Sequence, residues 1–304
     1  TVEQIDAAAT ANDASVITIG RNSGEFIDRK AKDDFYLTEA EQTLIRNVSA
    51  AFHKAGKPVV VVLNIGGVIE VASWRDQVDA ILLAWQPGQE AGHAMADVLS
   101  GKVNPSGKLT DTFALDLKDY PAGENFPGVT LLGPDPAASG GIVINDRAAE
   151  VEYRDDIRVG YRHFNTRDVE VAYPFGYGLS YTRFEYRDLK LTREDAGFTA
   201  SVIVTNTGRR AGKEVVQLYV SAPNNALDKP AAELRAYART RLLQPGQSQT
   251  LVMRVDPRGL TSFDPEAHRW VAYPGRYTVR IGASSRDIRQ QAHFDIKDEL
   301  SFMP

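Results

Sequence analysis

The sequence predicts an α/β region with a mostly parallel sheet, followed by an all-β region that forms an antiparallel β-sandwich. Over residues 1–117, short continuous apolar runs alternate with segments of helical period, as in a sheet covered by helices on both faces. Over residues 184–304, the apolar residues recur at every second position, which is the period of strands with one buried face. Residues 118–183 are rich in Pro, Gly and aromatic side chains and indicate a connecting segment.

The α/β region begins with a helical segment that leads into the first of three strands. The predicted strands are residues 15–19, 59–63 and 80–84. A helix is expected after the first strand because Thr38 and Glu41 have the spacing of a capping box, in which each side chain binds a backbone N–H at the helix start. This helix should end near Lys54 and bury one face. The side chains predicted on that face are Leu44, Ile45, Val48 and Phe52.

A further helix is expected over residues 89–100, with Gly101 in the position that ends it. Beyond the connecting segment, four groups of alternating apolar residues predict the strands of the sandwich, with turn sequences between them. The side chains predicted to face its core are Val202, Val204, Val216, Leu218, Val220, Leu251, Met253, Val255, Tyr277, Val279 and Ile281.

The composition excludes several classes of protein. The 304 residues include 40 acidic and 35 basic side chains, which gives a net charge of -5. Because no Lys/Arg cluster could neutralise a row of phosphates, neither nucleic acid nor an anionic membrane is expected as a partner. The longest apolar runs are far shorter than the roughly 18 residues that a membrane span requires.

Two features of the chain bear on its cellular context. It contains no Cys, which fits a periplasmic or secreted bacterial protein but fits a cytoplasmic one almost as well. It opens at Thr1 inside a predicted helix, so we expect a further part of the protein upstream.

Few residues have the spacing of a known catalytic or ligand-binding motif. The five His residues are scattered, and no glycine-rich segment has the spacing of a phosphate-binding loop. No GxSxG sequence surrounds Ser23. Trp74 and Trp85 are candidates for stacking on a sugar ring, with core packing favoured for Trp85. The sequence therefore predicts no metal and no other cofactor.

One acidic residue, Glu25, stands in the connection that follows the first strand. This connection, residues 21–37, is long, and open α/β sheets bind ligands beyond the carboxyl ends of their strands. From its spacing alone, Glu25 is interpreted as a solvated surface carboxylate rather than a catalytic acid. Its neighbours Asp28, Arg29 and Lys30 are interpreted as a solvated charge run or as local ion pairs.

Four segments change this interpretation. They are SGEFIDR at residues 23–29, WQPGQEAG at 85–92, NPSGKL at 104–109 and FGYGLSYT at 175–182. In this order they resemble the C-terminal part of family 3 glycoside hydrolases of the β-glucosidase type, and the resemblance extends over essentially the whole chain. It implies that residues 1–117 form part of an α/β sandwich domain whose N-terminal part is missing, and that residues 184–304 form a fibronectin type III-like domain.

The resemblance also implies an activity. Such enzymes are retaining, exo-acting β-D-glucosidases that release terminal glucose from β-linked gluco-oligosaccharides or aryl glucosides. Their N-terminal (β/α)8 barrel, a portion absent from this chain, supplies an Asp nucleophile. The residue that matches the general acid/base of the family is Glu25, and Ser23 and Phe26 beside it are candidate substrate-binding residues. The chain alone is therefore expected to be inactive.

Several alternatives stay open. Phe26 stands where relatives usually have Gly, and it either lines the aglycone side of the site or anchors the loop. A β-xylosidase or a mixed-specificity glycosidase is the second candidate, because sugar selection depends mainly on the barrel. A non-catalytic carbohydrate-binding or interaction module is the third, although the predicted sandwich shows no solvent-facing stripe of Trp or Tyr.

Overall fold

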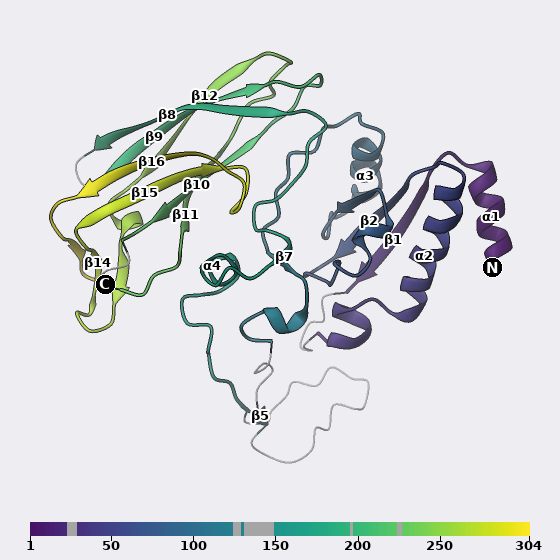
Figure 1. Cartoon of the computed structure of the whole chain (residues 1–304), viewed down its shortest axis with the longest axis horizontal. Helices are drawn as coiled ribbons and strands as arrows, with labels where there is room; N and C mark the ends of the chain where they lie inside the picture. The colour runs from purple at the N-terminus through teal and green to yellow at the C-terminus, as the bar shows by residue number, and fades with distance from the viewer. Residues whose placement is uncertain (23–28, 124–128, 131–148, 195–196, 224–226) are drawn as a thin grey trace. The chain divides into compact units, whose positions relative to one another are not determined.

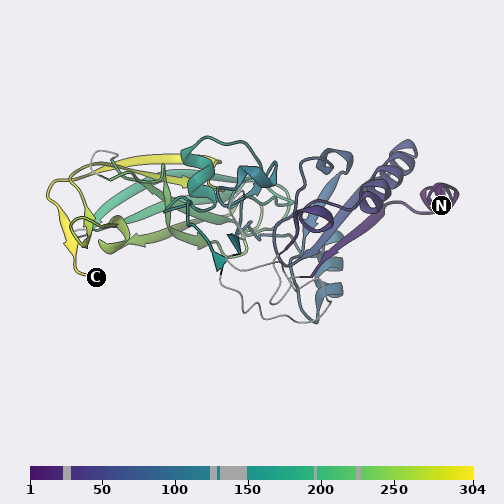
Figure 2. The ribbon, with the colours of Figure 1, turned by 90° about the horizontal axis from the view of Figure 1, so that it is seen from below.

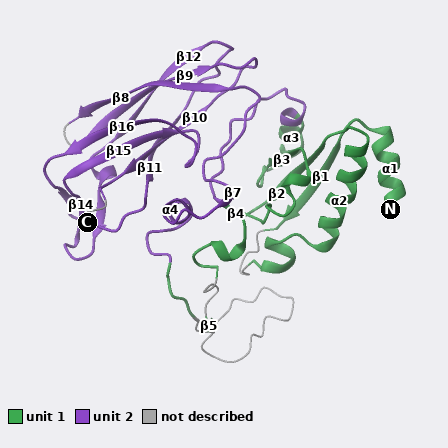
Figure 3. Ribbon diagram, in the orientation of Figure 1, with its two compact units in different colours: residues 1–96, 113–154 green, residues 97–112, 155–304 purple. Residues whose placement is uncertain are grey.

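The computed structural model describes the chain except for residues 23–28, 124–128, 131–148, 195–196 and 224–226 (Figure 1). The chain divides into two compact units (Figure 3). The first contains residues 1–96 and 113–154, and the second contains residues 97–112 and 155–304. These units are defined by contacts alone, and the domain limits expected from the sequence at residues 117 and 183 stay predictions.

The first unit is built on a three-stranded parallel sheet in the order β1-β2-β3. Its strands are β1 (Ser15–Arg21), β2 (Val59–Ile65) and β3 (Ala80–Leu83), as the sequence predicts. The central strand is almost fully buried, because Val59, Val61 and Ile65 are inaccessible to solvent. A strand buried on both faces reads as a continuous apolar run, which explains why the sequence identified it.

Three helices accompany this sheet along the chain. They are α1 (Val2–Ala11), α2 (Glu39–Lys54) and α3 (Ala91–Leu99). The capping box of α2 is confirmed, since the Thr38 side chain accepts a hydrogen bond from Glu41 N and the Glu41 carboxylate accepts one from Thr38 N. The helix ends at Lys54, as predicted.

The buried face of α2 is narrower than the sequence predicts. Ile45, Val48 and Phe52 are buried, but Leu44 is 43% exposed, so its prediction as a core residue is wrong. Leu44 and Ile45 are adjacent, and successive residues of an α-helix point in directions about 100° apart, so the face that packs on the sheet excludes one of them.

The second unit is an antiparallel β-sandwich. One sheet has the order β12-β9-β8 and the other has the order β11-β10-β15-β16. In both views of the ribbon their strands run along a common direction (Figure 1 and Figure 2). The bounds are β8 (Phe184–Glu194), β9 (Gly197–Asn206), β10 (Val215–Ser221), β11 (Glu233–Arg239), β12 (Ser248–Val255), β15 (Gly275–Gly282) and β16 (Ile288–Ile296).

The core between the two sheets matches the sequence prediction. All eleven side chains that the alternating pattern assigns to it are buried. Tyr277, for example, is 1% exposed, and its ring stacks on Phe294 with the ring centres 5.3 Å apart. The period of two therefore predicted both the class of fold and the residues that stabilise it.

Shorter elements complete the described chain. A small third sheet contains β13 (Ser262–Asp264), β14 (Arg269–Ala272) and β17 (Leu300–Phe302). Four short strands and one short α-helix remain among the described residues. The strands are β4 (Phe113–Ala114), β5 (Val129–Thr130), β6 (Ala149–Glu150) and β7 (Val171–Tyr173), and the helix is α4 (Tyr161–Thr166). No helix among the described residues is long and apolar enough to cross a membrane.

The aromatic-rich stretch between residues 155 and 183 packs within the second unit. The ring of Tyr161 stacks on Phe175 at 4.7 Å and meets Tyr219 of β10 edge-on at 5.9 Å. The Tyr161 hydroxyl accepts a hydrogen bond from Leu234 N. Tyr161 and Phe175 therefore extend the core of the sandwich, whereas Tyr181 of the same stretch is 44% exposed.

Candidate active site

The carboxyl ends of β1, β2 and β3 meet at one edge of the parallel sheet, where open α/β sheets bind their ligands. Three connections begin there, at residues 22–38, 66–79 and 84–90. The first carries Ser23, Glu25 and Phe26, and all three of these predicted site residues lie outside the described residues. The described part of the edge shows how the two ends of that connection are held.

The amino-terminal end is held by Arg21, the last residue of β1. Its guanidinium donates one hydrogen bond of 2.7 Å to each carboxylate oxygen of Glu41. Its Nε donates to the carbonyl oxygen of Asp34 at 2.9 Å. The hydrogen bonds from Arg21 lower the pKa of Glu41, and those to Glu41 raise the pKa of Arg21, so both groups are charged at neutral pH.

The carboxyl-terminal end is held by residues 29–37. Arg29 binds the carboxylate of Asp34 at 2.7 Å. Phe35 and Leu37 are buried, and Phe35 O accepts a hydrogen bond of 2.8 Å from Glu70 N in the connection after β2. Asp33, just before Asp34, has a φ of 63°, which is a left-handed conformation that Asp adopts more readily than most residues.

Tyr36 attaches the same segment to residues 116–120. Its hydroxyl donates a hydrogen bond of 3.0 Å to the Asp116 carboxylate and accepts one of 3.3 Å from Leu117 N. Burial raises the pKa of Tyr36, while the hydrogen bond from Lys118 N is the main cause of the lowered pKa of Asp116. The phenol and the carboxylate thus keep their donor and acceptor roles at neutral pH.

The connection after β2 is held by a buried carboxylate. Glu70 is 5% exposed and accepts hydrogen bonds from the backbone N and the hydroxyl of Ser73, at 2.6 and 2.7 Å. Trp74 is 2% exposed, and its indole N–H donates to Glu70 O at 2.9 Å. Trp74 is therefore a core residue and not a surface on which a sugar could stack, which corrects one of the two Trp candidates.

Trp85 begins the connection after β3. It is half-buried, has a φ of 51° and lies with its ring centre 6.3 Å from that of Phe113. A large side chain in the left-handed region is uncommon and persists only where the surroundings hold it. Gly88, with a φ of 75°, then turns the chain into α3.

Three of the described carboxylates at this edge are held by neighbouring residues. Asp34 is bound by Arg29, Glu41 by Arg21 and Glu70 by Ser73. Outside the undescribed gaps, no three His, Asp or Glu side chains lie close enough to hold a metal ion. His93 lies on the surface and pairs with Glu90 at 2.8 Å, as expected of a residue on an exposed helix face.

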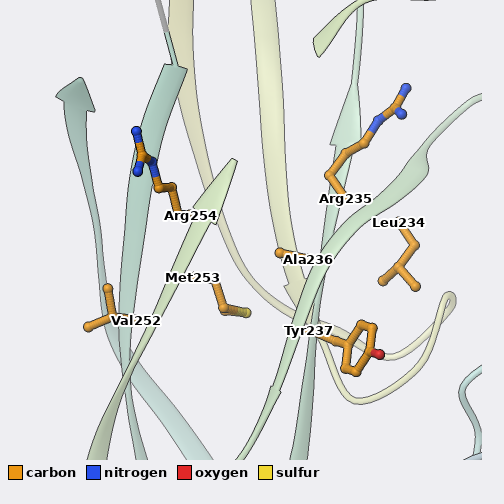
Figure 4. A pocket seen from close by; sticks show the side chains of 7 residues that line it. All are labelled: Leu234, Arg235, Ala236, Tyr237, Val252, Met253 and Arg254. Atoms are coloured by element: carbon orange, nitrogen blue, oxygen red, sulfur yellow. The ribbon is translucent and has the colours of Figure 1, made fainter. Parts of the chain in front are cut away.

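A cavity in the sandwich has none of these residues in its walls. Its volume is about 390 Å³, and the walls come from β11 and β12 (Figure 4). Arg235 and Arg254 line it, and each pairs with an acidic residue, Glu233 and Glu194 respectively. No carboxyl side chain lines this cavity, so it lacks the pair of carboxyl groups that glycoside hydrolysis requires.

Comparison with known families accounts for both units. Residues 1–181 match the glycosyl hydrolase family 3 C-terminal domain, and residues 214–285 match a fibronectin type III-like domain. The chain belongs to glycosyl hydrolase family 3. The expected fold class, an α/β region followed by a fibronectin type III-like sandwich, is confirmed.

The curated relatives that this chain matches are considerably longer. The chain is 40% identical to β-glucosidase A of Butyrivibrio fibrisolvens over 93% of its own length and 37% of the relative's. It is 41% identical to a β-glucosidase of Rhizobium radiobacter, covering 92% of this chain and 32% of that one. The chain thus spans about a third of the length of these curated relatives.

A solved structure covers the whole chain. This structure, β-glucosidase 3B from Thermotoga neapolitana in complex with glucose, superposes with a TM-score of 0.91 at 48% identity. It matches 100% of this chain, which corresponds to 40% of that protein. The chain therefore corresponds to the C-terminal portion of a family 3 enzyme.

Two of the family 3 segments identified in the sequence contact each other within the second unit. Leu109 N donates to Tyr177 O, and Gly176 N donates to Leu109 O, both at 2.8 Å. The Asn104 side chain accepts hydrogen bonds from the Ser180 hydroxyl and from Tyr181 N. NPSGKL and FGYGLSYT therefore stabilise one another, which is a structural role.

Of the two interpretations of Arg29, the structure shows the local ion pair, which Arg29 forms with Asp34. The sequence did not indicate the hydrogen bond from Arg29 to Val68, which joins two connections of the sheet edge. Arg21 and Asp34 were not identified at all. The signal that could have indicated them is the pair of Arg residues on either side of an acidic residue in a long connection.

Proposed function

We propose that this chain is the C-terminal portion of a retaining, exo-acting β-D-glucosidase and that Glu25 is its general acid/base. The observation that carries the proposal is the agreement over the full chain with the structure of a β-glucosidase in complex with glucose, at a TM-score of 0.91 and 48% identity. The place of Glu25 in the sequence, beyond the carboxyl end of β1, also supports it.

The proposed mechanism divides the two carboxyl groups between two portions of the enzyme. Retaining hydrolysis needs a nucleophile and an acid/base about 5 to 5.5 Å apart across the glycosidic bond. In our proposal an Asp of an N-terminal (β/α)8 barrel portion attacks the anomeric carbon, while Glu25 protonates the departing oxygen. Glu25 then deprotonates the water that releases glucose.

The protonation state of Glu25 would depend on the barrel. An acid that works near neutral pH needs a raised pKa, which comes from burial or from a neighbouring carboxylate. In the proposed arrangement, the barrel supplies both when it covers the connection that carries Glu25. Ser23 and Phe26 are proposed to contact the substrate beside it.

Replacement of the acid/base tests the assignment. In the complete enzyme, Glu25→Ala should lower kcat/KM for substrates with poor leaving groups by about 100- to 10,000-fold, the usual contribution of general acid catalysis. Azide should restore turnover of an activated aryl glucoside and yield a β-glucosyl azide, because the small anion enters the space left by the carboxylate. A Glu25→Ala enzyme with full activity would exclude the assignment.

The isolated chain gives a second test. Without the nucleophile, the purified 304-residue chain should not hydrolyse an aryl β-glucoside. Adding the separately purified barrel portion should restore turnover if the two portions associate. Turnover by the chain alone would contradict the proposed division of the catalytic groups.

A different sugar specificity is the second candidate. One relative, 33% identical over 94% of this chain, is an exo-α-(1→6)-L-arabinopyranosidase from Bifidobacterium breve. A similar stretch of sequence therefore occurs in an enzyme named for another sugar. Relative kcat/KM values for aryl β-glucoside, β-xyloside and α-L-arabinopyranoside will decide between these specificities, and the proposal expects the glucoside to be preferred.

A further inference from the structure

Two arginines hold the two ends of the segment that contains Glu25. Arg21 and Arg29 each stand four residues from Glu25 in the sequence. Both bind the same residue, because Arg21 Nε donates to the Asp34 carbonyl oxygen while Arg29 Nε and Nη2 donate to Asp34 Oδ1, at 3.0 and 2.7 Å. The other carboxylate oxygen of Asp34 accepts from Lys30 N at 3.3 Å.

Arg29 also reaches the neighbouring connection of the sheet edge. Its Nη1 donates a hydrogen bond of 2.7 Å to Val68 O, which lies just after β2. Gly67 makes this approach possible, since a Cβ at that position would lie 2.9 Å from Arg29 Nη1. The guanidinium thus joins the end of one connection to the next through a backbone acceptor that a side-chain substitution cannot remove.

Asp34 is itself held in place by its neighbours along the chain. Phe35 is 6% exposed, and its carbonyl oxygen accepts a hydrogen bond from Glu70 N. Tyr36 is bound to Asp116. The carboxylate that receives Arg29 is therefore attached to buried structure on its carboxyl-terminal side.

We propose that Arg29 and its partner Asp34 are positioning residues that set the placement of the general acid/base. The proposal rests on the assignment of Glu25 made above. Arg29 would not touch the substrate. It would act by fixing the point at which the chain leaves the Glu25 segment, so that the carboxyl group reaches the leaving-group oxygen.

The expected effect on rate exceeds the expected effect on stability. The Arg29 and Asp34 side chains are 26% and 24% exposed, and pairs in contact with water contribute modestly to folding. Proton transfer is far more sensitive, because a misplacement of about 1 Å in an active site can cost about 100-fold in rate. A positioning role therefore predicts that substitution of Arg29 or Asp34 lowers the catalytic rate strongly and the stability only slightly.

The leaving group of the substrate distinguishes positioning from a general loss of folding. Departure of 2,4-dinitrophenolate needs no proton, whereas departure of a sugar or a simple phenol does. In the complete enzyme, Arg29→Met should lower kcat/KM by about 10- to 100-fold for cellobiose and phenyl β-glucoside. The value for 2,4-dinitrophenyl β-glucoside should stay within about 3-fold of the parent. Asp34→Asn should have the same selectivity.

Three further variants serve as controls. Lys30→Met changes the adjacent exposed cation and should leave all three substrates unaffected. Ile45→Val lowers the stability of the same unit by about 0.5 to 1.5 kcal/mol and should not introduce a leaving-group dependence. Arg29→Lys keeps the charge, but a single ammonium cannot reproduce the planar guanidinium that binds Asp34 and Val68 together. Arg29→Lys should therefore recover only part of the rate that Arg29→Met loses.

A double variant separates this proposal from the assignment of Glu25. If Arg29 acts through Glu25, Glu25→Ala/Arg29→Met should be no slower than Glu25→Ala alone. Equal losses on all three substrates, or additive losses in the double variant, would overturn the positioning role while leaving Glu25 as the acid. A Glu25→Ala enzyme without leaving-group dependence would instead contradict the assignment of Glu25 itself.

Discussion

Arg21 and Glu41 join the last residue of β1 to the first turn of α2 through two parallel hydrogen bonds of 2.7 Å. The Glu41 carboxylate also accepts the hydrogen bond from Thr38 N that caps the helix. One carboxylate therefore fixes both the start of a helix and the start of the connection that carries Glu25. Bidentate pairs of this kind are among the stronger ion pairs in proteins.

The first prediction concerns the pH dependence of this pair. The pKa of Glu41 lies below its ordinary value of 4.5 in the folded protein, so its stabilisation is present above that value and is lost as the pH falls through the lower folded pKa. Arg21→Met should cost about 1.5 kcal/mol of stability at neutral pH. This value is at the lower end of the range for hydrogen bonds to charged groups, because the pair is in contact with water.

Thermal unfolding between neutral and acidic pH measures this effect. The difference in Tm between parent and Arg21→Met should shrink as the pH falls below 4.5. Glu41→Gln is the matched variant, because Gln keeps the capping hydrogen bond and removes the charge. A difference in Tm that does not change with pH would argue against the ion pair as the source of stability.

The second prediction concerns the contact between the NPSGKL and FGYGLSYT segments. A Cβ on Gly178 would lie 2.4 Å from Gly107 O, so the backbone would have to move. Gly178→Ala should therefore destabilise the second unit by about 1 to 3 kcal/mol, the usual cost of overpacking. Urea unfolding followed by tryptophan fluorescence measures it.

Gly107→Ala is the control for that substitution. A Cβ on Gly107 would have no neighbour within 4 Å. The stability of Gly107→Ala should therefore be equal to or slightly above that of the parent. Equal destabilisation by the two substitutions would show that close approach is not the reason for Gly178.

The third prediction compares two buried tyrosines. Tyr219 is 1% exposed and donates a hydrogen bond of 2.5 Å to the Gln217 side chain, whereas the hydroxyl of Tyr186 has no partner among the described residues. Burial raises the pKa of both phenols. Tyr219→Phe should cost about 1 to 3 kcal/mol, because it leaves a buried acceptor without its donor.

Tyr186→Phe should be neutral or stabilising, because it removes a hydroxyl that is buried without a hydrogen bond. The guanidinium of Arg289, 4.7 Å from the centre of the Tyr186 ring, would remain over the phenyl face. Chemical denaturation of the two variants side by side gives the comparison, and a large loss in Tyr186→Phe would point to a partner for its hydroxyl.

The fourth prediction concerns Asn206, which is fully buried at the end of β9. Its amide donates to Arg210 O and Leu243 O, both at 2.8 Å, and its carbonyl accepts from the Thr182 hydroxyl and Gly208 N. Asn206→Ala leaves these groups without partners and should cost more than about 3 kcal/mol. Calorimetric unfolding should show the loss as a lowered Tm.

The adjacent Thr205 is the control for Asn206. Its hydroxyl bonds the Ser248 hydroxyl on the exposed side of the strand. Thr205→Ala should change stability by less than about 0.5 kcal/mol, since water replaces an exposed partner. A similar loss at both positions would argue against burial as the cause.

The sequence predicted regular elements well wherever one periodic pattern decided the structure. The apolar run of β2 identified a strand covered on both faces, and the alternation that includes Val216 and Tyr277 identified the core of the sandwich. The capping box at Thr38 fixed the start of α2, because it is a local interaction between residues three apart. Leu44 was assigned wrongly, since period alone does not give the width of a buried face.

The candidate site was less accessible to sequence analysis. Motifs within single segments of the chain predicted both the family and a site beyond β1. Trp74 looked available to a ligand in the sequence, and only its contact with Glu70 places it in the core. For Arg29 the sequence left a solvated charge and a local ion pair open, and the structure shows the ion pair with Asp34 together with a hydrogen bond to the distant Val68.

The sequence by itself therefore determined the two kinds of fold, the family and the acidic residue proposed to do the chemistry. These depend on periodicity and on local motifs, which a linear sequence records directly. Only the tertiary structure decided which charged residues hold the ends of the Glu25 segment. Arg29 and Val68 are 39 residues apart and meet only because parallel strands bring their carboxyl ends to one edge of a sheet.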